Sequence, residues 1–117
     1  MERSIRVVVI EPDKPARITE IGQGLESMQA VVGGYIQVIP AYAIPGGKAL
    51  SRELILVLNE EGKLEDLPYN FRIWDGADYI AGTCFVCKEN GDEMVGLSDE
   101  EANLVVSLFN GEEHADG

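Results

Sequence analysis

The chain has 117 residues, of which 45% are hydrophobic and 26% are charged, as expected for one globular domain rather than a disordered or fibrous chain. No apolar run approaches the roughly 20 residues of a membrane helix. No secretory signal precedes Pro12, and two cysteines are too few for a disulfide scaffold. These observations favour a reduced, cytoplasmic protein.

Charge is distributed unevenly along the sequence. The 21 acidic residues outnumber the 9 basic ones, giving a net charge of −12. Residues 1–58 are neutral, residues 59–87 carry six acids against two bases (−4), and residues 88–117 carry nine acids against one base (−8). Because the chain has few basic residues to bind phosphate groups, the sequence argues against direct nucleic-acid binding and favours a cationic partner.

The first half of the chain predicts a strand, a helix and a second strand. Residues 4–10 are rich in β-branched side chains and form the first strand, and residues 11–17 form a loop. Gly33-Gly34 ends the helix, whose firm part begins near residue 23 because Gly22 and Gly24 weaken its start. Residues 35–39 form the second strand. The helix face is predicted from apolar residues spaced by three and four: Ile18, Ile21, Leu25, Met28 and Val32.

The second half predicts strands and a final helix. Residues 40–52 form a loop, 54–58 a strand, 59–63 a turn, 64–67 a short return strand, and 79–87 a further strand after a loop that contains Trp74. Asn90-Gly91 predicts a hairpin with residues 93–97. Ser98 and Glu101 form a capping box that begins a helix ending at Asn110-Gly111. The buried stripe of this helix is predicted to be Leu104, Val105, Leu108 and Phe109.

These elements predict the fold class α+β. Residues 1–111 form a single domain, in which two helices pack on a mainly antiparallel sheet of four to six strands. Residues 112–117 form a frayed acidic tail. Self-association into a homo-oligomer is compatible with this fold.

The residues do not assemble a recognisable catalytic site. The single histidine, His114, lies in the tail, which leaves no credible base for a nucleophile and no imidazole for zinc. Cys84 and Cys87 match C-x-x-C, but in a strand an offset of three places their sulfurs on opposite faces. Gly46-Gly47-Lys48 lacks the other residues of a phosphate loop. We therefore expect a non-enzymatic protein without catalytic residues, cofactor or metal.

The acidic second half has two interpretations. In the first it is a solvated surface, whose carboxylates at residues 99–101 also stabilise the positive end of the last helix. In the second it docks on a basic protein, either as a mimic of the DNA backbone or in another way. The residues predicted to bind such a partner are Asp92, Glu93, Asp99, Glu100 and Glu101.

An alternative function is the binding of a small molecule such as a nucleotide-like signal. Aromatic side chains line such a pocket and polar side chains orient the ligand. Arg52 and Arg72 are the cations available to hold a phosphate. The predicted ligand-binding residues are Tyr35, Asn59, Asn70, Arg72, Trp74 and Asp78.

Three ordered motifs carry a family resemblance. The first joins Leu25, Met28-Gln29 and Val32-Gly33-Gly34-Tyr35-Ile36; the second is Asn59-Glu60-Glu61-Gly62-Lys63-Leu64 with Leu67-Pro68 and Asn70; the third is Asp78, Ile80 and Gly82-Thr83. Over residues 5–87 the chain resembles the domain of unknown function 3846. The resemblance implies a small cytosolic bacterial protein, often carried by phages and conjugative elements, and it brings no known activity. The motif segments are either turn chemistry or exposed groups that meet at a binding site.

From these observations we expect a non-enzymatic accessory binding protein of a phage or mobile element. Its acidic face docks on a basic host protein, as an anti-defence inhibitor or DNA mimic would, without contact to a membrane or to nucleic acid. A small-molecule or nucleotide-signal binding protein is the alternative.

Overall fold

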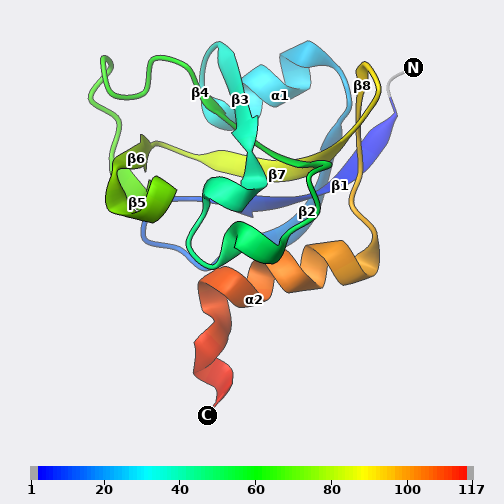
Figure 1. Ribbon diagram of the computed structural model, residues 1–117. Helices are drawn as coiled ribbons and strands as arrows, with labels where there is room; N and C mark the ends of the chain where they lie inside the picture. The colour runs from blue at the N-terminus through cyan, green and yellow to red at the C-terminus, as the bar shows by residue number, and fades with distance from the viewer. Residues whose placement is uncertain (1–2, 116–117) are drawn as a thin grey trace.

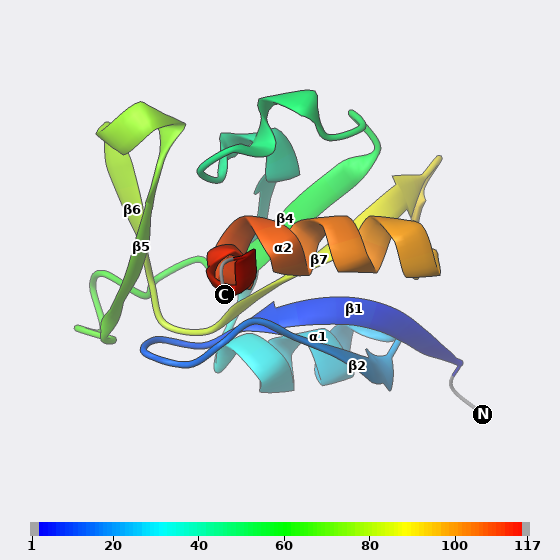
Figure 2. The ribbon, with the colours of Figure 1, turned by 90° about the horizontal axis from the view of Figure 1, so that it is seen from below.

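One six-stranded sheet with a helix on each face forms most of the molecule (Figures 1 and 2). The computed structural model describes residues 3–115, and their side chains as far as residue 110. The strand order is β2-β1-β7-β4-β3, β8 pairs with β7, and every pairing is antiparallel. The predicted α+β class is confirmed. The strands of this sheet are β1 (Ser4–Ile10), β2 (Arg17–Gly22), β3 (Ile36–Pro40), β4 (Leu54–Asn59), β7 (Cys84–Asn90) and β8 (Glu93–Val95).

Strand β7 is the centre of the sheet because it pairs with β1, β4 and β8. Its first four residues are fully buried, so both of its faces contribute to packing. Successive side chains of a strand point to opposite faces. Cys84 and Val86 therefore belong to one apolar core, and Phe85 and Cys87 belong to the other. The two cores lie on either side of a single strand.

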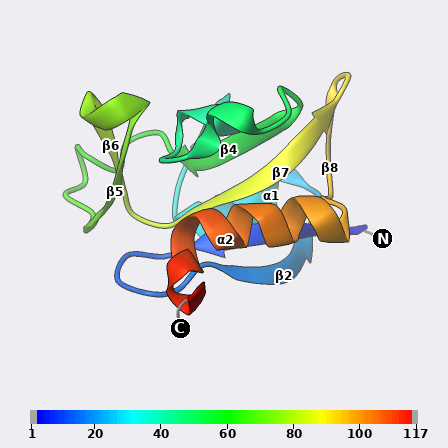
Figure 3. The same cartoon turned by 60° about the horizontal axis from the view of Figure 1, so that its bottom comes forward.

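Each core is closed by a helical layer. Helix α1 (Leu25–Val32) covers the Phe85 side with Met28 and Val32. Helix α2 (Asp99–Ala115) covers the Val86 side, together with the short 3-10 helices η1 (Ala41–Ala43) and η2 (Gly47–Ala49) (Figure 3). Within the predicted stripe of α2, Val105 is fully buried, but Leu104 is 48% exposed and does not belong to the core.

A separate hairpin stands at one end of the sheet (Figure 2). It consists of β5 (Tyr69–Ile73), the 3-10 helix η3 (Trp74–Gly76) and β6 (Asp78–Ala81). Phe71 and the α2 residue Phe109 join it to the body by an edge-to-face contact, with ring centroids 4.9 Å apart. The sequence prediction of a loop at residues 69–73 was wrong, as was that of one continuous strand at residues 79–87. Gly82, with φ +91°, separates β6 from β7.

Two other predicted elements were wrong. Residues 18–22 are not helical but lie in β2, whose six residues all pair with β1. A spacing of three between Ile18 and Ile21 fits a helix, but pairing with a distant strand outweighs this weak local preference. Residues 64–67 form a turn rather than a return strand, closed by the hydrogen bond from the Leu67 amide to the Gly62 carbonyl (2.9 Å).

Helix ends follow the local chemistry of the sequence. Gly33 ends α1 with φ +85°, and its amide bonds to the Gln29 carbonyl at 2.8 Å, as expected for a left-handed cap. Helix α2 continues past Asn110 to Ala115, beyond its predicted end. Residues 116–117 of the predicted tail lie outside the described residues. None of the helices in the described part of the chain is long and apolar enough to span a membrane.

Candidate functional site

Two cavities meet at Trp74, at the tip of the β5–β6 hairpin. The first, which we call the aromatic cavity, has a volume of about 530 Å³. The second, which we call the polar cavity, measures about 430 Å³. Both volumes lie in the range of small-molecule sites. The aromatic cavity is lined by Tyr42, Ala43, Ile44, Gly46, Lys48, Ala49, Arg52, Trp74 and Asp75.

The hairpin tip holds Trp74 in an unusual backbone conformation. Trp74 and Asp75 have φ values of +53° and +56°, in the left-handed region that bulky residues rarely occupy. Gly76 follows with φ +93°. The turn is closed by the Ala77 amide on the Trp74 carbonyl (3.0 Å) and by Arg72 Nη1 on the Gly76 carbonyl (3.2 Å). Strained backbone of this kind is concentrated at functional sites.

The facing wall of the aromatic cavity comes from the segment between β3 and β4. Pro40 and Pro45 bracket η1, which carries Tyr42. Gly47 packs so closely that a β-carbon there would lie 2.8 Å from Ile44 Cγ1 and 3.0 Å from the Ala41 carbonyl oxygen. Only glycine fits this approach without displacing the wall. The segment predicted as a loop is therefore a packed wall with a defined shape.

The aromatic cavity combines two rings with two cationic groups. Tyr42 and Trp74 make an edge-to-face contact with centroids 5.9 Å apart. The guanidinium carbon of Arg52 lies 4.2 Å from the centre of the Tyr42 ring, close enough for a cation–π interaction. Lys48 Nζ lies 3.6 Å from Asp75 Oδ2, and both side chains are 83% exposed. This arrangement can stack a planar ring and place an anionic group between Arg52 and Lys48.

The polar cavity lies on the other side of Trp74. Asp78 Oδ1 accepts hydrogen bonds from Lys63 Nζ and from the Tyr79 amide (2.8 Å), which together hold the pKa of the Asp78 carboxyl below its ordinary value. Lys63 also lies over the Tyr79 ring, 4.6 Å from its centre. Because Asp78 neutralises Lys63, the carboxylate of Glu60 gives the cavity a net negative charge. The lining is Gln37, Ile39, Leu58, Asn59, Glu60, Gly62, Lys63, Leu64, Ile73, Trp74, Asp78, Tyr79, Ile80 and Ala81.

The structure brings together three of the six residues predicted to bind a ligand. Asn59, Trp74 and Asp78 all line the polar cavity. Tyr35 is 67% exposed and lines a different cavity, beside Glu26 and Gln29 of α1. Arg72 supports the hairpin tip, whereas Arg52, the other predicted cation, lines the aromatic cavity. Sequence reasoning missed Tyr42, although Pro40 and Pro45 around it indicated a shaped loop.

The two motif asparagines form what we call the asparagine clamp. Asn59 is 3% exposed; its Nδ2 donates to the Val32 carbonyl (3.2 Å) and its Oδ1 accepts from the Glu61 amide (2.7 Å). Nδ2 of Asn70 donates to the carbonyls of Ile10 (3.0 Å) and Gly82 (2.9 Å). These bonds join turns that are far apart in the sequence.

The three motifs converge at another, smaller cavity. Its volume is about 260 Å³, and its lining includes Gly33 from the first motif, Pro68 from the second and Thr83 from the third. The Gly82 amide donates to the Pro68 carbonyl at 2.7 Å. Turn geometry thus accounts for Gly33 and Gly82, and the clamp accounts for Asn59 and Asn70.

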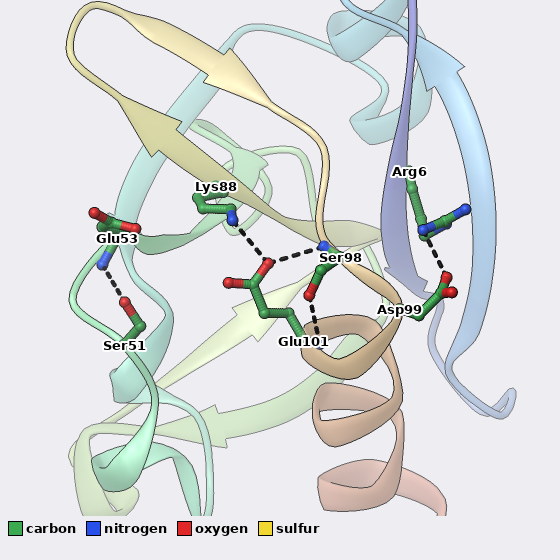
Figure 4. A network of polar contacts seen from close by, with 7 residues as sticks. All are labelled: Arg6, Ser51, Glu53, Lys88, Ser98, Asp99 and Glu101. Atoms are coloured by element: carbon green, nitrogen blue, oxygen red, sulfur yellow. Dashed lines mark hydrogen bonds and ion pairs between the residues drawn. The ribbon is translucent and has the colours of Figure 1, made fainter.

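Two of the five predicted partner-binding acids are engaged within the molecule (Figure 4). Asp99 pairs with Arg6 at 2.7 Å. Glu101 Oε1 lies 3.0 Å from Lys88 Nζ and accepts from the Ser98 amide (2.9 Å), while the Glu101 amide donates to Ser98 Oγ (3.1 Å). Burial raises the pKa of Glu101, but the Ser98 and Lys88 bonds outweigh it and hold the pKa below its ordinary value. The capping box is confirmed.

The remaining predicted acids lie on the surface. Asp92 and Glu93 are exposed at the β7–β8 turn, and Glu100 is exposed in the first turn of α2. Asp92 and Glu93 also border a shallow cavity beside Met94. Of the five predicted acids, Asp99 and Glu101 therefore make ion pairs within the molecule, although Asp99 stays exposed, and Asp92, Glu93 and Glu100 are open to solvent.

The cysteines are structural thiols in this arrangement. Cys84 and Cys87 are both fully buried and free, in cores on opposite faces of β7, as the strand periodicity predicted. Burial raises the pKa of the Cys84 thiol well above its usual range and that of Cys87 to about 12. Among the residues with described side chains, no group of three histidine, cysteine or carboxylate residues is placed to hold a metal ion. His114 lies outside the described side chains.

Comparison with known proteins identifies the family. Neither a curated protein nor a solved structure matches the chain. The model of the domain of unknown function DUF3846 matches residues 5–110, a range that includes both cores, the asparagine clamp and both cavities beside Trp74. The chain therefore belongs to the DUF3846 family.

Proposed function

We propose that the protein is a non-enzymatic binding protein that takes a planar aromatic anion, such as a nucleotide, in the aromatic cavity. The observation that carries the proposal is the placement of Tyr42, Trp74 and Arg52 around one space of about 530 Å³. A ring stacks on the aromatic side chains, and its anionic group binds Arg52 and Lys48. These are the interactions that nucleotide-binding pockets use.

The charge of the cavity also favours an anion. Lys48 and Arg52 exceed the single carboxylate of Asp75, in a chain whose overall charge is −12. The Lys48–Asp75 pair is exposed to solvent, so an incoming phosphate displaces Asp75 at little cost. The site is thus a local basic spot on an acidic protein.

A direct test uses the fluorescence of Trp74, the single tryptophan of the chain. Titration with adenosine monophosphate, guanosine monophosphate and uncharged adenosine should change the emission, with the monophosphates binding more tightly than adenosine. A ligand at 100 times its Kd should also raise the free energy of unfolding by about 2.7 kcal/mol.

Matched variants identify the site. Arg52→Gln should weaken monophosphate binding at least tenfold, whereas Arg17→Gln, at an exposed arginine outside the lining of the cavity, should leave it unchanged. Equal binding to the wild type and the Arg52 variant would refute this site. Absence of any fluorescence or stability change across a panel of nucleotides would reject the nucleotide as ligand.

A second proposal is that the open acids dock on a basic protein surface. Four of the five predicted acids are exposed, namely Asp92, Glu93, Asp99 and Glu100, and of these Asp99 is paired with Arg6. On this proposal the chain is an accessory protein of a phage or mobile element, and its partner is a basic host protein such as a defence nuclease. Capture from host lysate should weaken steeply with salt. Reversal of Asp92, Glu93 and Glu100 to lysine should abolish capture, and salt-insensitive capture would contradict the proposal.

A further inference from the structure

The edge of the main sheet at β3 presents unpaired backbone groups. Strand β3 pairs with β4 on one side and is the last strand of the sheet. The Glu60 amide donates to the Tyr35 carbonyl at 2.8 Å, so these opposite residues form a hydrogen-bonded pair. Antiparallel pairs alternate, which directs the amide and carbonyl of Ile36 and of Val38 away from β4.

This edge lacks the usual protection against pairing. Edge strands are commonly blocked by charged side chains or by a bulge. Residues 36–40 are uncharged, and the register with β4 is regular throughout. Pro40 limits the edge because it offers no amide, which leaves the two residues Ile36 and Val38 as the template. Val38 is 38% exposed.

The polar cavity lies beside the same edge. Gln37 and Ile39, which alternate with the template residues, line this cavity from the sheet side, and Ile80 lines it from the hairpin. A strand added to β3 would therefore place every second side chain toward the cavity. Backbone pairing with a pocket for alternate side chains is the usual basis of strand-addition recognition.

The charge of the cavity identifies the kind of strand. Lys63 is neutralised by Asp78, whereas Glu60 is exposed and contributes an unbalanced negative charge. The apolar part is enlarged by Leu64, whose side chain is 86% exposed. A second copy of this chain would bring another Glu60 and its own net charge of −12, which opposes self-pairing.

We propose that β3 and the polar cavity bind an extended peptide segment of a partner protein, with a lysine or arginine among apolar residues at the positions facing the cavity. The proposal names a peptide site separate from the nucleotide site, although Trp74 borders both. It requires the outward amide of Val38, which plays no part in the native sheet.

That amide gives a selective test. Val38→Pro removes the outward N–H and leaves the hydrogen bonds to β4 in place, while Val38→Ala removes the same side chain but retains the amide. A displayed library of random heptapeptides is selected on the wild-type protein and then measured on both variants. Circular dichroism and urea unfolding establish that both variants are folded.

The expected result is a set of peptides enriched in lysine or arginine that bind Val38→Ala within about threefold of the wild type and bind Val38→Pro at least tenfold more weakly. Glu60→Gln should reduce the affinity and the salt dependence. Hydrogen exchange at Ile36 and Val38 should slow when the peptide binds. If Val38→Pro misfolds, exchange at Ile36 and Val38 in the wild type decides the question instead. Slower exchange at both amides on peptide binding supports the proposal, and unchanged exchange overturns it.

Three further results would overturn the proposal. The first is a selection that yields no peptide distinguishing the two Val38 variants. The second is selected peptides that are acidic or insensitive to Glu60→Gln. The third is slow exchange at both amides in the free protein together with a dimeric mass in solution, which would show that a second copy occupies the edge.

Discussion

The asparagine clamp and the aromatic cavity use polar side chains in opposite ways. In the clamp, Asn59 and Asn70 donate to backbone carbonyls of the same molecule. In the aromatic cavity, Arg52 and Lys48 are exposed to solvent, and they contact the Tyr42 ring and the exposed Asp75 carboxylate. The clamp lies within the family motifs, while the aromatic cavity is built by residues outside them.

This comparison predicts that the asparagine clamp serves the stability of the fold and that the aromatic cavity serves recognition. A buried polar group that loses its partner is costly, so changes in the clamp should act on folding. A partly exposed aromatic or basic side chain contributes little to folding, so changes in the aromatic cavity should act on binding. On this view the two asparagines of the three sequence motifs stabilise the fold by joining its turns.

The largest expected effect comes from the clamp. Asn59→Ala leaves the Val32 carbonyl and the Glu61 amide without their side-chain partner, which should lower the free energy of unfolding by about 2–3 kcal/mol. Urea denaturation measures the change. Asn103→Ala, at an exposed asparagine of α2, serves as the control and should be neutral or slightly stabilising, by no more than about 0.7 kcal/mol. Equal stability of the two variants would contradict a structural role for the clamp.

Gly47→Ala tests whether the wall of the aromatic cavity is rigid. The added methyl group meets Ile44 and the Ala41 carbonyl, so stability should fall by about 1–2 kcal/mol and nucleotide affinity should fall with it. Urea denaturation and Trp74 fluorescence measure the two effects. A variant that loses neither would show that the wall adjusts freely.

The helix start resembles the clamp, because its polar groups are satisfied internally. Ser98→Ala removes the acceptor of the Glu101 amide and should cost about 1 kcal/mol in urea denaturation. Ser107→Ala provides a matched control in the same helix. Its exposed hydroxyl bonds only to the Leu104 carbonyl, and alanine is the better helix former, so the control should be neutral or slightly stabilising.

The smallest effect is a pH dependence at Glu101. Its folded-state pKa lies below the ordinary value of 4.5. The associated stabilisation is therefore complete above that value and is lost as the pH falls through the folded-state pKa. Glu101→Gln should make stability less dependent on pH in this acid range, by about 0.5 kcal/mol. If the Lys88 and Ser98 bonds were absent, urea denaturation between pH 3 and 6 would give the same pH dependence of the free energy of unfolding for the variant and the wild type.

Features encoded by neighbouring residues were predictable from the sequence. Strands β1 and β4, the β7–β8 hairpin, the glycine cap of α1 and the capping box of α2 all depend on short-range chemistry. Opposite burial of the two cysteines followed from the period of a strand. Each of these depends on residues within one turn or one strand.

Features that depend on distant contacts were not predictable. Residues 17–22 form a strand only because β1 lies beside them. The aromatic cavity joins Tyr42, Arg52 and Trp74 from separate segments, and no local pattern indicates that they meet. The sequence identified Arg52 as a candidate cation but not Tyr42 as its aromatic partner. Tyr42 lies in a segment without a repeating pattern, so the sequence does not indicate which way its side chain points.

The two buried thiols allow local unfolding of the sheet to be measured by chemical labelling. Cys84 and Cys87 lie on the strand that holds three others together, one on each face. A thiol reagent can reach them only when β7 separates from its neighbours, and opposite faces must both be uncovered for double labelling. The ratio of singly to doubly labelled protein thus measures whether the two layers detach one at a time or in a single event.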